Sequence, residues 1–283
     1  STDLPARRTH HPRRRDPNPP SSAARRRAET MTPVLVAGHH RSGTSLLAQL
    51  LVEAGLFMGD RLMGATEANP HGHVEDLDVV EIHNQILADN GLTWQVDEEF
   101  IPVVNPDLEE RIRALVELRR KQGRAWGVKD PRICLFLPLW KHIVPNARIL
   151  ITFRSPAASV DSMERRAARD LLERRGDPEQ NWRFWTEPDH GARLWLVHNR
   201  ALVRAARAYG DDVLVVDFDQ LADDADVIAK LDKHWDLGLD HVRPAEVFDN
   251  SAVTAASRVL QVGDDGLARE IEDVWAELVE LRS

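Results

Sequence analysis

A glycine-bounded turn at residues 38–45 carries the residues best suited to chemistry in this sequence. The apolar run at 34–37 leads into Gly38-His39-His40-Arg41-Ser42-Gly43-Thr44-Ser45, and a leucine-rich segment with helical spacing follows. A strand, a glycine-rich turn and a helix N-terminus in this order direct backbone N–H groups and the positive end of the helix dipole at one point. The turn is therefore predicted to bind an anion, with a phosphate as the first candidate.

This turn is close to the phosphate loop of nucleotide triphosphatases, G-x-x-x-x-G-K-[ST], but differs at one position. Thr44 stands where that motif has lysine, and Ser45 keeps the hydroxyl position. In triphosphatases the lysine reaches the β- and γ-phosphates, so the loop is poorly equipped to polarise a terminal phosphoryl group. Arg41 supplies a cation three residues earlier instead. An ordinary glycine-bearing turn between a strand and a helix is the alternative.

Charged residues also follow two other apolar runs. Residues 125–128 are followed by Lys129-Asp130-Pro131-Arg132, and residues 148–153 are followed by Arg154. Because ligands of open parallel sheets bind at the carboxyl ends of the strands, these side chains are predicted to collect with Arg41 in one cleft. An anion would find there a positive pocket in a protein whose formal net charge is −9.

Strand-like and helix-like segments alternate along the chain, which predicts the elements that position these residues. The predicted strands are 33–37, 125–128, 148–153 and 213–216. The predicted helices are 43–54, 77–90, 107–121, 135–143, 157–172, 188–209, 222–234 and 267–278. The alternation predicts an α/β fold of three layers, with a doubly wound parallel sheet and a P-loop.

The composition is that of a globular protein, since 42% of the 283 residues are hydrophobic and 29% are charged. Residues 1–30 differ, with eight arginines, three acidic residues and no apolar periodicity, so this basic N-terminal extension is predicted to be disordered. Residues 31–283 are predicted to form one domain, in which insertions near 57–106 and 174–192 cover the substrate.

The sequence also indicates the cellular compartment of the protein. No apolar run approaches the ~20 residues of a membrane span, and no secretion signal is recognisable. The single cysteine, Cys134, lies in an apolar run and is predicted to be a buried structural thiol. These features predict a cytoplasmic protein that binds no membrane and no nucleic acid.

The spacing of an arginine and a serine farther along the chain also indicates a phosphate-binding site. Arg154 ends a strand, and Ser162 follows eight residues later, where its hydroxyl can meet a phosphate beside the arginine fork. Ser159 shares that helix face and is the competing donor. With Arg41-Ser42-Gly43-Thr44-Ser45, this pair resembles the signatures of sulfotransferases that use 3′-phosphoadenosine 5′-phosphosulfate (PAPS). In that family the loop is written [KR]-[SAG]-G-[ST]-[ST], and the resemblance covers roughly residues 33–240.

The resemblance implies a P-loop sulfotransferase fold, related to nucleotide kinases, and a sulfuryl transfer from PAPS that leaves adenosine 3′,5′-bisphosphate and requires no metal. The resemblance also implies which residues bind the donor: His40, Arg41, Ser42, Gly43, Thr44, Ser45, Arg154 and Ser162. Lys129-Asp130-Pro131 is similar to a Lys-Asp-Pro of tyrosylprotein sulfotransferases. Two features depart from the cytosolic members: Pro131 stands in the place of their histidine base, and the late glycine loop around the 3′-phosphate is absent.

Transfer to a hydroxyl needs a general base, and cations for the charge that develops on the bridging oxygen. Arg41 and Lys129 suit the second role. Glu75 is the favoured base, because several family members use a glutamate after the first helix, and His73 is the alternative. Negative charge at a helix N-terminus is the competing interpretation of Glu75. His71, His73 and Glu75 alternate as metal ligands could, but no further ligand cluster accompanies them, so no metal is predicted.

The acceptor is predicted to be a small molecule or a carbohydrate, with transfer to an amine or to a protein tyrosine less favoured. An aromatic segment follows at Asn181-Trp182-Arg183-Phe184-Trp185. It is expected either to lie over the cleft, where aromatic side chains stack on sugars, or to form a homodimer contact. Two other functions stay open. One is a P-loop small-molecule kinase in which Asp217 and Ser45 hold magnesium, and the other is an inactive nucleotide-binding scaffold.

Overall fold

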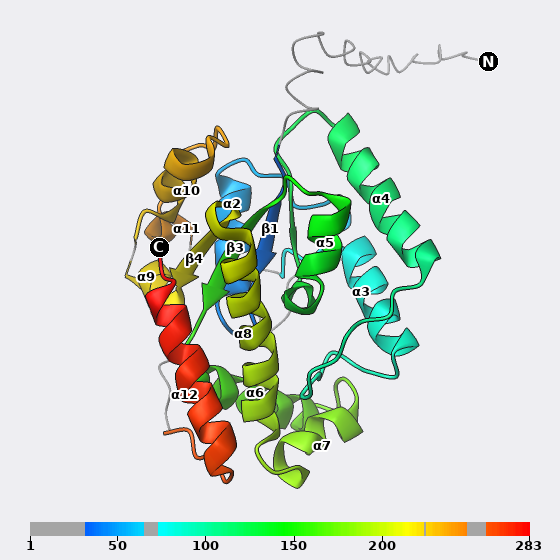
Figure 1. The fold of residues 1–283 in the computed structure, drawn as a ribbon, viewed down its shortest axis with the longest axis vertical. Coiled ribbons are helices and arrows are strands. Elements are labelled where there is room, and N and C mark those ends of the chain that lie inside the picture. Colours follow the sequence, from blue (N-terminus) through cyan, green and yellow to red (C-terminus); the bar gives the residue numbers. More distant parts are fainter. Residues whose placement is uncertain (1–31, 65–72, 224, 248–258) are drawn as a thin grey trace, which may run out of the picture.

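Four parallel strands form the sheet of this protein, in the order β2-β1-β3-β4 (Figure 1). The structure is a computed structural model that describes residues 32–64, 73–223, 225–247 and 259–283. The strands are β1 (Val34–Ala37), β2 (Gly127–Lys129), β3 (Arg148–Phe153) and β4 (Val213–Asp217). In the register, Val36 of β1 lies between Lys129 of β2 and Leu150 of β3.

Helices connect and cover the strands. Their bounds are α2 (Thr44–Glu53), α3 (Leu77–Asp89), α4 (Pro106–Lys121), α5 (Leu137–Ile143), α6 (Pro156–Leu172), α7 (Pro178–Thr186), α8 (His190–Tyr209), α9 (Phe218–Ala222), α10 (Val227–Trp235), α11 (Pro244–Val247) and α12 (Asp265–Glu280). Two 3₁₀ helices, Pro131–Leu135 and Gly210–Asp212, complete the set that the described residues form.

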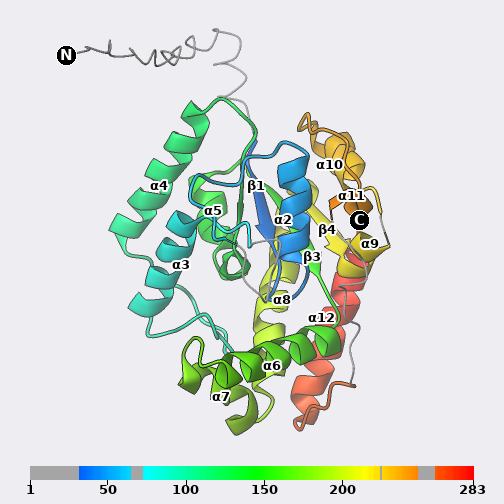
Figure 2. The same ribbon diagram turned by 180° about the vertical axis from the view of Figure 1, so that it is seen from behind.

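Alternation along the strands divides the core into two layers. Leu35 and Ile149 pack with α3, α4, α5, α8 and α12 on one face of the sheet. Val36 and Leu150 pack with α2, α9 and α10 on the other. Because both faces are covered, the strands are apolar on both sides, as parallel strands usually are. The views from front and back place α8 and α2 on opposite faces (Figures 1 and 2). The prediction of a three-layer, doubly wound α/β fold is confirmed.

Several helices differ from the sequence prediction. The helix predicted at 222–234 is observed as α10, which begins only at Val227, where Asp226 caps it, and the short helices α9 and α11 were not predicted. Helix α7 was not predicted at all. Its start carries a recognisable signal, since Asp177 accepts the backbone N–H groups of its first turn and Pro178 follows directly.

The predicted basic extension at residues 1–30 and His71 lie outside the described residues. Within the described residues, none of the helices has both the length and the apolar character needed to cross a membrane. Cys134 is buried as predicted, and burial raises the pKa of its thiol.

Candidate active site

The predicted anion loop lies where the order of the sheet reverses. The chain runs from β1 outward to β2 and then returns past β1 to β3, so the carboxyl ends of β1 and β3 border the crevice that doubly wound folds use for ligands. Two contacts from the end of β3 hold the loop. The Thr152 hydroxyl donates to the carbonyl of Ser42 at 2.9 Å, and the Arg154 guanidinium approaches the carbonyl of Arg41 at 3.4 Å.

Both glycines of the loop are required by close packing. A Cβ on Gly43 would lie 2.3 Å from the ring of Phe218, and this glycine has a left-handed φ of 86°. A Cβ on Gly38 would lie 2.5 Å from the carbonyl oxygen of Thr152. Neither position therefore accepts a larger residue without movement of the backbone. The loop begins and ends against the strands and helices that form the crevice.

The cations of the predicted donor site meet at this loop. Arg41 donates from Nε to the Ser162 hydroxyl at 2.9 Å, and Arg154 lies over the Phe218 ring at 4.5 Å. Burial lowers the pKa of Arg41 to about 10, and the nearby positive charges of Arg166 and Arg154 add to this shift. Such a cluster of like charges is stabilised when an anion binds. Ser159, the competing hydroxyl, is fully buried.

Lys129 connects the loop to the predicted base. Its Nζ donates to the Ser45 hydroxyl at 3.1 Å, to the His73 carbonyl at 2.9 Å and to Oε1 of Glu75 at 2.7 Å. The side chain is 1% exposed. Burial lowers the pKa of the Lys129 ammonium, and the Glu75 carboxylate opposes that shift. One buried lysine thus touches both the anion loop and a carboxylate.

Glu75 lies just before α3 and faces the site. The next residue, Asp76, caps α3, so the helix N-terminus is served by Asp76 and Glu75 is available to Lys129. His73 is near as well, with Nδ1 3.9 Å from Oε1 of Glu75. Burial lowers the pKa of His73, which keeps its imidazole neutral at pH 7. Val74, between the two candidate bases, has a left-handed φ of 51°, a strained conformation for a β-branched residue.

A buried chain of polar side chains, which no sequence pattern predicts, lies behind Glu75. Asp130 contacts Nε of Arg132 with both carboxylate oxygens, at 2.9 and 3.1 Å. It also accepts from Nδ1 of His83 at 2.8 Å, while Nε2 of His83 accepts from the Trp140 indole at 2.9 Å. Although burial acts in the opposite direction, Arg132 and His83 hold the pKa of Asp130 well below its usual range. His83 belongs to a pattern of apolar helical spacing, which gives no hint of this role.

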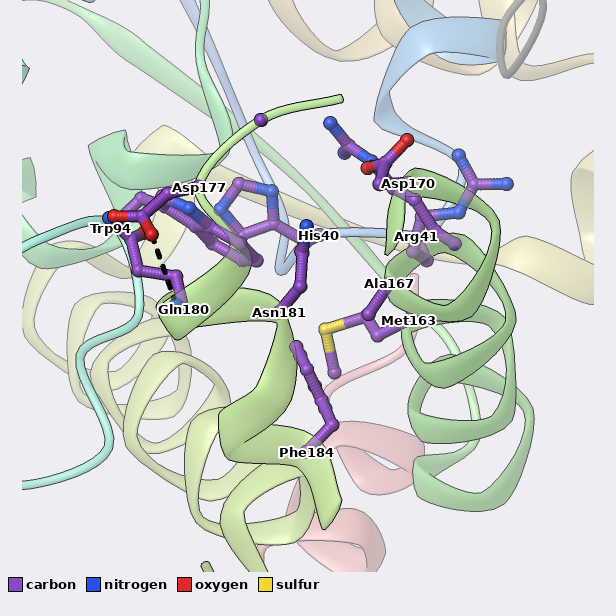
Figure 3. A pocket seen from close by; sticks show the side chains of 12 residues that line it. His40, Arg41, Trp94, Met163, Ala167, Asp170, Asp177, Gln180, Asn181 and Phe184 are labelled. Carbon is purple, nitrogen blue, oxygen red and sulfur yellow. Dashed lines mark hydrogen bonds and ion pairs between the residues drawn. The ribbon is translucent and has the colours of Figure 1, made fainter. Parts of the chain in front are cut away.

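A cavity of about 400 Å³ opens beside Glu75 and Arg132. Trp94 and His40 form part of its wall, with ring centroids 4.8 Å apart. The same two residues border an adjoining cavity of about 100 Å³ between α6 and α7 (Figure 3). His40, predicted to bind the donor, thus lines the cavities next to the loop. Trp94 lies in the covering segment predicted at 57–106, but it was not singled out there.

Helix α7 contributes to the smaller cavity through one side only. Asn181 and Phe184 line the cavity, as Figure 3 shows. Trp182 and Trp185 are 53% and 47% exposed, and neither lines the two cavities described here. The expectation that the whole aromatic segment covers the cleft is therefore met by Phe184 and not by the two tryptophans. The helical period turns them to another side of α7.

Arg183, the cation of that segment, belongs to a cluster of ion pairs. Among the described residues, potential ligand atoms of Asp97, Glu187 and His190 lie within 4.8 Å of one another. Asp97 is paired with Arg183 and Arg193, and Nδ1 of His190 lies 3.0 Å from its carboxylate. Although burial opposes it, hydrogen bonds from His190 and Arg193 hold the pKa of Asp97 well below its usual range. The protein's own cations thus occupy this carboxylate.

The sequence profile of the Sulfotransferase family matches residues 33–237. The chain belongs to the sulfotransferase family. Among solved structures, the sulfotransferase domain from the curacin biosynthetic pathway aligns with a TM-score of 0.51 at 13% identity, over 88% of this chain and 98% of that one. A sulfotransferase from Alicyclobacillus acidocaldarius aligns with a TM-score of 0.49 at 17% identity, over 90% and 97%. Sulfotransferase STF9 from Mycobacterium avium aligns with a TM-score of 0.49 at 14% identity, over 92% and 79%. No curated protein matches the chain.

The family match covers the loop, the polar chain around Lys129 and the Arg154–Ser162 pair. It therefore places this sulfotransferase-family chain among transferases. At 13% identity the structure from the curacin pathway supports the fold alone. The roles of individual side chains stay predictions that depend on the geometry described above.

Proposed function

We propose that this protein transfers the sulfuryl group of PAPS to a hydroxyl of a small-molecule or carbohydrate acceptor. The observation that carries the proposal is the position of Lys129, whose Nζ is within hydrogen-bond distance of both Ser45 in the loop and Glu75 beside the cavity. A donor group in the loop and an acceptor in the cavity would then meet at one cation. This arrangement suits a transfer between two bound molecules.

The loop residues fit an anionic donor. Arg41 is buried among other arginines, and α2 begins directly after the loop, so the backbone N–H groups of its first turn would be available to an anion. Arg154 and Ser162, at the end of β3 and on α6, suit the 3′-phosphate of the nucleotide. Together these groups would bind and orient PAPS, which supplies the activated sulfuryl group, without a contribution from the acceptor cavity.

Glu75 is proposed as the general base. Its Oε1 is held by Lys129, which leaves Oε2 on the side of Arg132 and the cavity. As the acceptor oxygen bonds to sulfur, its proton passes to Glu75, and the bond from sulfur to the 5′-phosphate oxygen breaks. Lys129 and Arg41 stabilise the charge on that leaving oxygen. His73 is the alternative base, since burial lowers the pKa of its imidazole and its Nδ1 lies 3.9 Å from Oε1 of Glu75.

A kinase function is less well supported. Asp217, the proposed magnesium ligand, uses one oxygen to cap α9 and lies 3.3 Å from Arg282 with the other. Ser45, its proposed partner, accepts a hydrogen bond from Lys129. These contacts give both residues roles that do not involve a metal ion.

An acceptor screen with PAPS tests the proposed function. Purified protein is incubated with PAPS and a library of sugars, polyols and phenols, and products are read by mass for the gain of one sulfuryl group. Release of adenosine 3′,5′-bisphosphate together with a sulfated product supports the enzyme. Tight binding of adenosine 3′,5′-bisphosphate without transfer to any acceptor would support the inactive scaffold instead.

A further inference from the structure

Arg132 is a cation beside the proposed base that the sulfuryl-transfer scheme does not use. One of its terminal nitrogens, NH2, lies 3.6 Å from Oε2 of Glu75. The side chain is only 10% exposed, yet the residue lines the 400 Å³ cavity together with Glu75. Any acceptor that gives its proton to Oε2 must therefore pass next to this guanidinium.

The guanidinium is held rigidly from behind. Asp130 contacts Nε with both oxygens, and Asn84 accepts from NH1 at 3.1 Å. Asp130 in turn is fixed by His83, which is fixed by the indole of Trp140. Since Nε2 of His83 accepts the indole hydrogen, Nδ1 carries the proton that Asp130 accepts. The chain from α5 through α3 thus fixes the direction of the arginine fork.

The NH2 group of Arg132 is the part left for a ligand. A guanidinium has five N–H hydrogens in a fixed plane. The contacts with Asp130 and Asn84 use Nε and NH1, while NH2 has the 3.6 Å ion-pair contact with Glu75 and no hydrogen bond within the described residues. An oxygen placed in the cavity next to Oε2 would complete its coordination.

The charges around Arg132 favour a neutral oxygen. Arg132 and Lys129 carry two positive charges, and Glu75 and Asp130 carry two negative charges, all within one buried group. A carboxylate bound at NH2 would lie directly beside the Glu75 carboxylate, although Arg166 and Arg175 also line the cavity. A hydroxyl can accept from NH2 without adding charge.

We propose that the preferred acceptor is a vicinal diol. One of its hydroxyls receives the sulfuryl group, and Arg132 binds the oxygen on the adjacent carbon. The proposal rests on the proposed function, because it takes Glu75 as the base. Gauche oxygens on adjacent carbons lie about 3 Å apart, which is close to the 3.6 Å between Glu75 Oε2 and Arg132 NH2. One hydroxyl then donates its proton to Glu75 while its neighbour accepts from Arg132. Arg132 becomes a specificity-determining residue that also selects which hydroxyl is sulfated.

Matched acceptors test this assignment. Radiolabelled PAPS is supplied with cyclohexanol, trans-cyclohexane-1,2-diol and cyclohexane-1,4-diol, and separately with phenol and catechol. The wild-type protein is expected to sulfate the 1,2-dioxygenated member of each set about tenfold faster or more, in kcat/KM, because a hydrogen bond to a charged group is gained. The 1,4-diol controls for the mere addition of a second hydroxyl.

Arg132→Lys separates recognition from folding. Lysine keeps the positive charge beside Asp130 but loses the planar fork, so the ratio between the 1,2-diol and the mono-alcohol is expected to fall towards one. Arg175→Lys, at another arginine that lines the same cavity, is the matched control and is expected to keep the wild-type ratio. Binding of adenosine 3′,5′-bisphosphate shows that each variant is folded.

The outcomes distinguish the two proposals. A wild-type ratio near one, or a ratio that Arg132→Lys leaves unchanged, would overturn the diol assignment while sulfuryl transfer stands. Transfer to other acceptors of the wider library but to none of these diols would also overturn the diol assignment. Failure to bind adenosine 3′,5′-bisphosphate, or binding of it without transfer to any acceptor of the library, would count against the proposed function itself.

Discussion

The loop side and the cavity side of this site are built in different ways. The loop side comes from one short segment between β1 and α2, completed by Arg154 and Ser162 at the next strand along the sheet. The cavity side combines Glu75, Trp94 and Arg132 with residues of α6 and α7. Lys129 contacts Ser45 on the loop side and Glu75 on the cavity side, and His40 of the loop also lines the cavities. The anion loop is therefore formed by residues that are neighbours in the sequence, while the acceptor cavity is formed by segments that only tertiary packing brings together.

This difference predicts that binding and turnover can be separated. Residues of the loop side should control affinity for the nucleotide, and Glu75 should control transfer. Lys129 should affect both. Variants on the two sides therefore test whether nucleotide affinity and sulfuryl transfer depend on different residues.

The largest expected effect is on turnover in Glu75→Gln. Loss of a positioned general base commonly costs 10²- to 10⁴-fold, so kcat is expected to fall by about that factor. Affinity for adenosine 3′,5′-bisphosphate, measured by calorimetry, is expected to stay within about threefold. His73→Gln is the matched control at the neighbouring candidate, and a greater loss there than in Glu75→Gln would reassign the base.

The next effect is on nucleotide affinity in Arg154→Ala. Charged hydrogen bonds contribute about 1.5–3 kcal/mol, which corresponds to about a 10- to 100-fold rise in Kd for adenosine 3′,5′-bisphosphate. The loss should be much smaller for adenosine 5′-monophosphate, which has no 3′-phosphate. Arg204→Ala, at an exposed arginine of α8 paired with Glu99, is the control. Equal losses for the two nucleotides would place Arg154 away from the 3′-phosphate.

The pH profile should report on the residue that joins the two sides. Burial lowers the pKa of Lys129 below its ordinary 10.5, and only the ammonium can stabilise the leaving oxygen. The profile of kcat/KM, which reports on the free enzyme, is therefore expected to fall with rising pH at a midpoint below 10.5. Lys129→Arg should move this fall to higher pH because the guanidinium stays charged. A wild-type profile that stays flat up to pH 10.5 would contradict this role.

The smallest effect concerns stability where the loop packs on the helices. His198 on α8 lies 5.0 Å from His39 between ring centroids, and burial lowers the pKa of His198 to about 4. The unfolded chain then binds a proton that the folded chain does not, so stability is full above pH 6.5 and is lost as the pH falls towards 4. His198→Asn should reduce the loss between pH 7 and 5 by about 2 kcal/mol, measured by urea unfolding. An unchanged loss would show that His198 does not titrate in this range.

Local patterns were enough to predict the sheet and the loop. The four predicted strands match the observed ones to within one or two residues, because a buried parallel strand is a short apolar run. The start of α6 also has a local signal, because Ser155 caps the helix and Pro156 is its first residue. Ser162 meets Arg41 because the loop and α6 follow adjacent strands of the sheet.

The acceptor side could not be predicted in the same way. His83 and Trp140 lie on two separate helices and were not singled out in the sequence, and only packing joins them through Asp130 to Arg132. Trp182 and Trp185 read as a binding surface, but the phase of α7 turns them away from the cavities. Contacts between distant segments depend on helix phase and crossing angle, which the spacing of single residues does not encode.

The most direct test of the central claim is a calorimetric titration of the wild-type protein with adenosine 3′,5′-bisphosphate in the presence of EDTA, beside ATP with and without magnesium. The loop between β1 and α2 is predicted to bind the bisphosphate tightly with EDTA present and to prefer it over ATP. Binding of ATP that depends on magnesium, with no binding of the bisphosphate, would contradict the account and favour a kinase.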